Sequence, residues 1–144
     1  MPFFHNQSRD ELRRFYMEAW RKHRERLPME PLEAQIADLI ALHPEYQPAL
    51  ENPDALDKDY TPESGQSNPF LHMGLHMAIR EQVSTDRPQG IRAAFDAAVK
   101  KFGSPHDAEH QMIECLAEAL WDAQRSGRAP DEIAYLERVR KISR

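Results

Sequence analysis

The sequence predicts an all-α fold: a single-domain helical bundle of about six helices with one long, Pro-rich acidic loop. Apolar residues recur at helical spacing in separate segments, and Pro, Gly, Ser or Asn stands where these segments begin and end. No segment alternates apolar and polar residues as a strand would. A length of 144 residues is common for one domain, so we expect residues 1–144 to form a single unit.

Two helices are predicted before the long loop. The first covers residues 8–27, because Ser8 and Glu11 have capping-box spacing and Pro28 follows the apolar stripe. The second covers residues 31–43, with Pro31 at its first position and Pro44 after its end. The outward face of the first helix is basic and is interpreted as a solvated face, with a binding stripe as the alternative. Its cations are Arg13, Arg14, Arg21, Lys22, Arg24 and Arg26.

Residues 44–69 are rich in proline and acidic side chains and have no sustained periodicity, which predicts a long loop. Loops of this length in compact domains tend to be lids, binding loops or linkers. Several apolar side chains in the segment can anchor it against the core, so we expect it to be ordered. These side chains are Tyr46, Leu50, Leu56 and Tyr60.

Four further helices are predicted after the loop, over residues 69–84, 91–102, 105–126 and 130–142. Asn68 and Ser104 are the expected N-caps of the first and third. Gly103 and Gly127 are the expected stops of the second and third, since glycine commonly follows the last turn of a helix.

Five chemistry-bearing side chains repeat at one-turn intervals on two of these helices. His72 and His76 are four residues apart, and His106, His110 and Glu114 follow one another at the same interval. Side chains at this spacing leave one helix face, and at about 100° per residue both sets border the predicted apolar side. Two neighbouring helices of this kind can bring four imidazoles and a carboxylate to one ion. We therefore predict a divalent transition-metal site for zinc, iron, nickel or manganese.

The roles of the nearby carboxylates follow from the same hypothesis. Glu114 is expected to be an additional ligand or, as the catalytic residue, the base that acts on metal-bound water. Asp107 or Glu109 can accept hydrogen bonds that orient the imidazoles. Glu63, in the long loop, is a further candidate ligand or general base. An open coordination position would favour hydrolysis, whereas a closed set of ligands would make the metal structural.

Two alternatives do not need a metal. The paired histidines can be core-edge residues satisfied by hydrogen bonds, as His5, His23 and His43 are expected to be surface or packing residues. The chain can also be an interaction module, in which the basic first helix and a basic C-terminus dock an acidic partner or nucleic acid. The C-terminal cations are Arg138, Arg140, Lys141 and Arg144.

Composition and the absence of known motifs argue against several other classes of function. A formal net charge of -5 argues against a general nucleic-acid coat. The single cysteine, Cys115, excludes an intrachain disulfide and is expected to face the polar side of its helix as an ordinary thiol. No signal-peptide pattern or apolar run of roughly 18 residues is present, which predicts a cytoplasmic protein without a membrane partner. The sequence has no phosphate-binding glycine loop and no serine-hydrolase elbow.

Residues 68–82, NPFLHMGLHMAIREQ, and residues 106–127, HDAEHQMIECLAEALWDAQRSG, resemble the bacterial domain-of-unknown-function family 1841. The similarity spans nearly the whole chain, but it implies no activity or substrate. The HxxxH and HxxxE elements are also similar to those of hemerythrin-like di-iron bundles. This chain lacks matching ligand motifs on four helices, which argues against a di-iron centre and oxygen binding.

Overall fold

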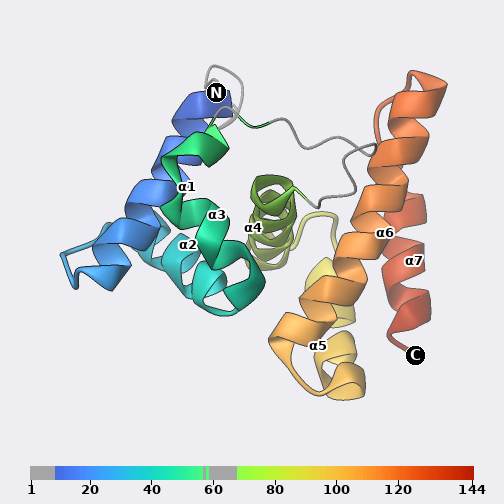
Figure 1. Cartoon of the computed structure of the whole chain (residues 1–144). Helices are drawn as coiled ribbons and strands as arrows, with labels where there is room; N and C mark the ends of the chain where they lie inside the picture. Colours follow the sequence, from blue (N-terminus) through green and yellow to red (C-terminus); the bar gives the residue numbers. More distant parts are fainter. Residues whose placement is uncertain (1–8, 57, 59–67) are drawn as a thin grey trace. The chain divides into compact units, whose positions relative to one another are not determined.

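The computed structural model describes residues 9–56, 58 and 68–144, and all regular elements in this part of the chain are helical (Figure 1). The all-α prediction is therefore confirmed, and the number of helices is close to the predicted six. The described residues form two compact units, Met1–Met73 and Gly74–Arg144. That the chain acts as one domain stays a prediction. The α-helices are α1 (Arg9–Arg24), α2 (Pro31–Ala41), α3 (Gln47–Glu51), α4 (Pro69–Thr85), α5 (Ile91–Phe102), α6 (Pro105–Ser126) and α7 (Glu132–Ile142).

In the N-terminal unit, α1 packs against α2 and α3 (Figure 1). The apolar faces of these helices form the core, and Arg13 is buried with them. Arg13 Nη1 donates hydrogen bonds to the backbone oxygens of Ala55, Leu56 and Lys58, so it ties α1 to a turn that is distant in sequence. The buried apolar residues of the three helices are Tyr16, Ala19, Trp20, Ile36, Ala37, Leu39, Ile40 and Leu50.

The first helix is shorter than predicted. It ends at Arg24 because Arg26 adopts a left-handed backbone conformation with φ 57°, and the Leu27 amide then donates to the Lys22 carbonyl. A left-handed residue followed by such a backbone hydrogen bond commonly ends a helix, and here it leaves Leu27 at the surface, 40% exposed. Ser8, the predicted cap, lies outside the described residues.

The predicted loop contains more helix than expected. Residues 44–56 fold into the 3₁₀ turn η1 (Pro44–Tyr46), α3 and a second 3₁₀ turn, η2 (Pro53–Leu56). Prolines at the starts of these elements have no unsatisfied amide and a φ suited to a helix, so they begin helical turns. Leu50 anchors the segment as predicted, being buried, whereas Tyr60 and Glu63 lie outside the described residues.

In the C-terminal unit, α6 packs against α5 and α7 around an apolar core to which α4 contributes Ile79 (Figure 1). The predicted cap of α6 is confirmed, since Ser104 Oγ accepts a hydrogen bond from the Asp107 amide at 3.1 Å. Helix α7 begins at Glu132 and not at Pro130, because Asp131 is its N-cap. Other members of this core are Ile91, Ala94, Met112, Ile113, Leu116, Ala119, Tyr135, Leu136 and Val139.

Cys115 lies in this core and is 7% exposed, which corrects the prediction that it faces the polar side of its helix. Both α5 and α7 pack on α6, so the buried face of α6 is turned away from the His106–Glu114 stripe. Trp121, on the same side of α6 as the His106–Glu114 stripe, is 58% exposed. Burial raises the pKa of the Cys115 thiol, which fits the interpretation as an ordinary, unreactive cysteine.

Within the described part of the chain, no helix has both the length and the apolar character that a membrane crossing requires.

Candidate metal centre

The first turns of α6 present two imidazoles side by side. Ser104 caps the helix, and His106 and His110 follow one turn apart with their ring centroids 4.3 Å from each other. Both side chains are half-buried. The four-residue spacing in the sequence therefore predicted this pair correctly as neighbours on one helix face.

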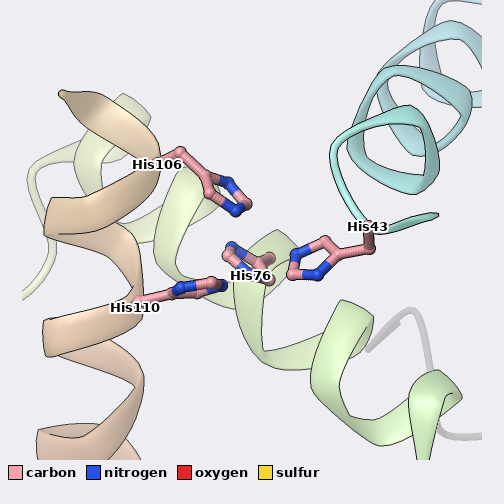
Figure 2. A group of neighbouring side chains, drawn as sticks. All are labelled: His43, His76, His106 and His110. Carbon is pink, nitrogen blue, oxygen red and sulfur yellow. The ribbon is translucent and has the colours of Figure 1, made fainter. Parts of the chain in front are cut away.

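A third imidazole comes from α4. His76 is fully buried, at 0% exposed, and its ring centroid lies 5.2 Å from that of His106 and 4.9 Å from that of His110. In Figure 2 the side chains of His106 and His110 point from α6 toward His76. One ring nitrogen from each of the three histidines lies within 4.8 Å of those from the other two. These three residues of the C-terminal unit are called the histidine cluster below.

A buried carboxylate fixes the orientation of His76. Glu109 Oε1 lies 2.8 Å from His76 Nδ1, and Arg80 Nε donates to both carboxylate oxygens at 3.3 and 3.2 Å. Burial favours the neutral carboxyl group, but the hydrogen bond from His76 and the charge of Arg80 outweigh it and hold the pKa of Glu109 below its usual range. An ionised carboxylate can only accept, so Nδ1 of His76 carries a proton, and in the neutral ring the lone pair is then on Nε2.

This arrangement is suited to holding a divalent transition metal. Neutral imidazoles are common ligands of zinc, iron and nickel, and a carboxylate bonded to the other ring nitrogen is the usual way in which a protein orients such a ligand. Of the two predicted orienting carboxylates, Glu109 makes the contact with a histidine, while Asp107 has an exposed side chain.

The remaining predicted site residues have different surroundings. His72 precedes His76 by one turn of α4 and belongs to the N-terminal unit, where it is half-buried. Glu114 follows His110 by one turn and is exposed. Their roles as ligands, and that of Glu114 as a base, stay predictions. Glu63 and His5 lie outside the described residues.

The N-terminal unit contains a further buried histidine, His43, which Figure 2 also draws. It is 2% exposed, its Nδ1 lies 2.9 Å from Glu45 Oε1, and its ring stacks on Tyr46 with centroids 5.3 Å apart. The ring of His72 meets it edge-on at 4.8 Å. The hydrogen bond from His43 lowers the pKa of Glu45.

Sequence reasoning treated His43 as a surface or packing residue, and its pairing with Glu45 was missed. The signal was the short His-Pro-Glu segment, in which the carboxylate follows the imidazole by two residues. His23 fits the earlier expectation, since it is exposed and stacks on Trp20 with centroids 5.1 Å apart.

The fold and the site define an all-α protein with a histidine cluster that could hold a metal ion. The family model of the Domain of unknown function (DUF1841) matches residues 8–141, and the chain therefore belongs to this family, as its two histidine segments suggested. No curated protein and no solved structure matches the chain.

Proposed function

We propose that this protein binds one divalent transition-metal ion through His76, His106 and His110. The observation that supports the proposal is the meeting of three imidazoles from two helices, with ring nitrogens within 4.8 Å of one another. Glu109 adds independent support, because it holds His76 in the tautomer that offers Nε2 to a metal.

Three histidine ligands leave one position of a tetrahedral metal for another group. Where water takes this position, a bound ion of this kind lowers the pKa of the water to about 7 and makes hydrolysis accessible. His72 and Glu114, the other ligands predicted from the sequence, are the protein candidates for the position. Glu114 is also the candidate base, and its exposed side chain suits proton exchange with solvent.

The interaction-module alternative receives less support from the described residues. On the basic first helix, Arg21 pairs with Glu18 and Glu25, and Lys22 pairs with Glu33 at 2.8 Å. Near the C-terminus, Arg138 pairs with Asp122 at 3.0 Å and Arg140 with Glu137 at 3.1 Å. Cations engaged within the chain are less available to an acidic partner or nucleic acid.

The decisive experiment is a metal titration of the tag-free, metal-depleted protein, with elemental analysis of the loaded form. We expect about one ion per chain, and we expect His106→Ala and His110→Ala to weaken zinc binding by more than about 100-fold. Both side chains are half-buried, so these variants should fold, which circular dichroism would check. His23→Ala, at an exposed position, is the matched control and should bind as the wild type does.

Two results would contradict the proposal. One is the absence of stoichiometric metal after loading with zinc, iron, nickel and manganese in turn. The other is metal binding that His106→Ala and His110→Ala leave unchanged.

A further inference from the structure

Arg80 brings a positive charge to the histidine cluster. It follows His76 by one turn of α4, so the two side chains leave the same face of the helix, with a rise of about 6 Å between them along its axis. Glu109 links them, since its Oε1 lies 2.8 Å from His76 Nδ1 and its Oε2 lies 3.2 Å from Arg80 Nε. Arg80 therefore lies at the edge of the proposed metal centre, within the C-terminal unit.

Only part of the guanidinium group of Arg80 is used in this contact. Nε donates to both oxygens of Glu109, and no hydrogen bond from Nη1 or Nη2 is found with the described residues. The side chain is 27% exposed, and neither terminal nitrogen is among the buried, unsatisfied atoms of the described part of the chain, so solvent reaches both. Because the group is planar and its N–H bonds have fixed directions, the edge formed by Nη1 and Nη2 faces a different direction from the Nε–H bond.

An oxyanion fits this edge of Arg80. Two N–H groups in a fixed fork match two oxygens of a carboxylate or a phosphate, and such charge-assisted pairs are stronger than neutral hydrogen bonds. The charge balance also favours an anion. A divalent ion held by neutral imidazoles brings its full charge to the site, whereas Glu109 offsets only the charge of Arg80. The site stays positive even with Glu114 as a ligand.

We propose that the substrate is a small anionic molecule whose carboxylate or phosphate group binds Nη1 and Nη2 of Arg80, while a second group of the same molecule reaches the open position of the metal. This inference rests on the proposed function and deepens it by naming the substrate class. Arg80 is then a substrate-binding residue, and its pairing with Glu109 holds the guanidinium plane in place before the anion binds.

The test measures the binding of two probes, inorganic phosphate and succinate, to the zinc-loaded full chain by isothermal titration calorimetry. We expect Arg80→Gln to weaken the binding of at least one probe by about 10- to 100-fold, because a charge-assisted pair is lost. Arg80→Lys keeps the charge but not the fork and should show an intermediate loss. The probe whose affinity depends on Arg80 identifies the oxyanion.

Arg128→Gln is the matched control for these titrations. It removes the same charge from an exposed arginine of the same unit, so it should bind both probes as the wild type does. A loss in Arg128→Gln as large as that in Arg80→Gln would show that the probes respond to the charge of the whole unit, and it would overturn the inference.

A structural role of Arg80 makes a different prediction. If Arg80 only anchors Glu109, Arg80→Gln weakens zinc binding and leaves the affinity of the zinc-loaded protein for both probes unchanged, and this result would overturn the inference. Each variant is therefore titrated with zinc first, and circular dichroism checks that it folds. If Arg80→Gln fails to fold, Arg80→Lys decides, because an ammonium group can still pair with Glu109 but has no planar fork of N–H bonds.

Failure of this inference is distinguishable from failure of the proposed function. Stoichiometric zinc binding to the wild type, together with probe affinities that neither Arg80 variant changes, would overturn the inference alone. Absence of any stoichiometric metal in the wild type would overturn the proposed function, and the inference with it.

Discussion

Glu109 and His76 form a buried hydrogen bond, 2.8 Å from Oε1 to Nδ1, between residues that are 33 positions apart in the sequence. Arg80 lies on the same helix as His76 and pairs with the same carboxylate, so Glu109 has a cation on one side and an imidazole on the other. The bond connects α4 to α6 within the C-terminal unit and directs Nε2 of His76 away from the carboxylate. The chemistry of the histidine cluster therefore depends on a residue that is not itself a candidate ligand.

Replacing Glu109 with Gln should weaken zinc binding by about 10- to 100-fold, because an amide holds the imidazole less firmly and raises its basicity less than a carboxylate does. The measurement is a competitive zinc titration. Asp107→Asn is the control, since the sequence predicted the same role for both carboxylates and the observed hydrogen bond to His76 comes from Glu109. Equal effects of the two substitutions would count against the role assigned to Glu109.

Replacing Ser104 with Ala should lower the free energy of unfolding by about 1 kcal/mol, the usual cost of losing an N-cap side chain. It should also weaken zinc binding, because fraying of the first turn of α6 loosens His106. Asp131→Ala removes the cap of α7 and is the matched control. A loss of affinity in Asp131→Ala as large as that in Ser104→Ala would show that the effect comes from stability and not from the position of His106.

Replacing Arg13 with Met should destabilise the N-terminal unit by about 1–3 kcal/mol, because backbone oxygens that accept from the guanidinium group lose a charged donor. Chemical denaturation followed by circular dichroism would measure the loss. Arg14→Met changes the neighbouring, exposed arginine in the same way and should have an effect within about 0.5 kcal/mol of zero. A similar loss in both variants would contradict the bracing role of Arg13.

The thiol of Cys115 should react slowly with a thiol reagent at pH 8 and rapidly after denaturation, because it is buried and its pKa is raised. The raised pKa also makes the free energy of unfolding depend on pH. The folded state favours the protonated thiol. The thiol therefore contributes its full stabilisation below the pKa of an unfolded cysteine, about 8.5, and this contribution is lost as the pH rises above that value. Cys115→Ala should unfold with less pH dependence between about pH 8 and 10. Fast labelling of the native protein would contradict the buried position.

Local patterns were enough to predict the helices and part of the site. The caps at Ser104 and Gly103, and the one-turn spacing of His106 and His110, depend on neighbours in the sequence, and the structure has them as predicted. The segment after Pro44 was misjudged because prolines were interpreted as interruptions, although each can also start a helical turn.

Tertiary contacts explain what the sequence could not reveal. Which face of α6 is buried depends on how α5 and α7 pack on it, so the burial of Cys115 could not be derived from a helical projection of α6 alone. The pairing of His76 with Glu109 joins two helices, and no local spacing encodes it. His43 is a packing residue, as one of its two predicted roles had it, but its contacts with Glu45, Tyr46 and His72 follow no helical spacing and could not be derived from the sequence.

The apolar core of the C-terminal unit is formed by side chains from α4, α5, α6 and α7, among them Ile79, Ile91, Met112 and Val139. Small zinc domains lack a core of this kind. They fold only when the metal binds, and much of the binding free energy is used in folding. For the proposed ion we expect the opposite order, with the helices folded before the metal binds. Removal of the metal with a chelator should therefore leave a folded protein that can take up an ion again, and the fraction of loaded molecules would follow the supply of metal without any cycle of unfolding and refolding.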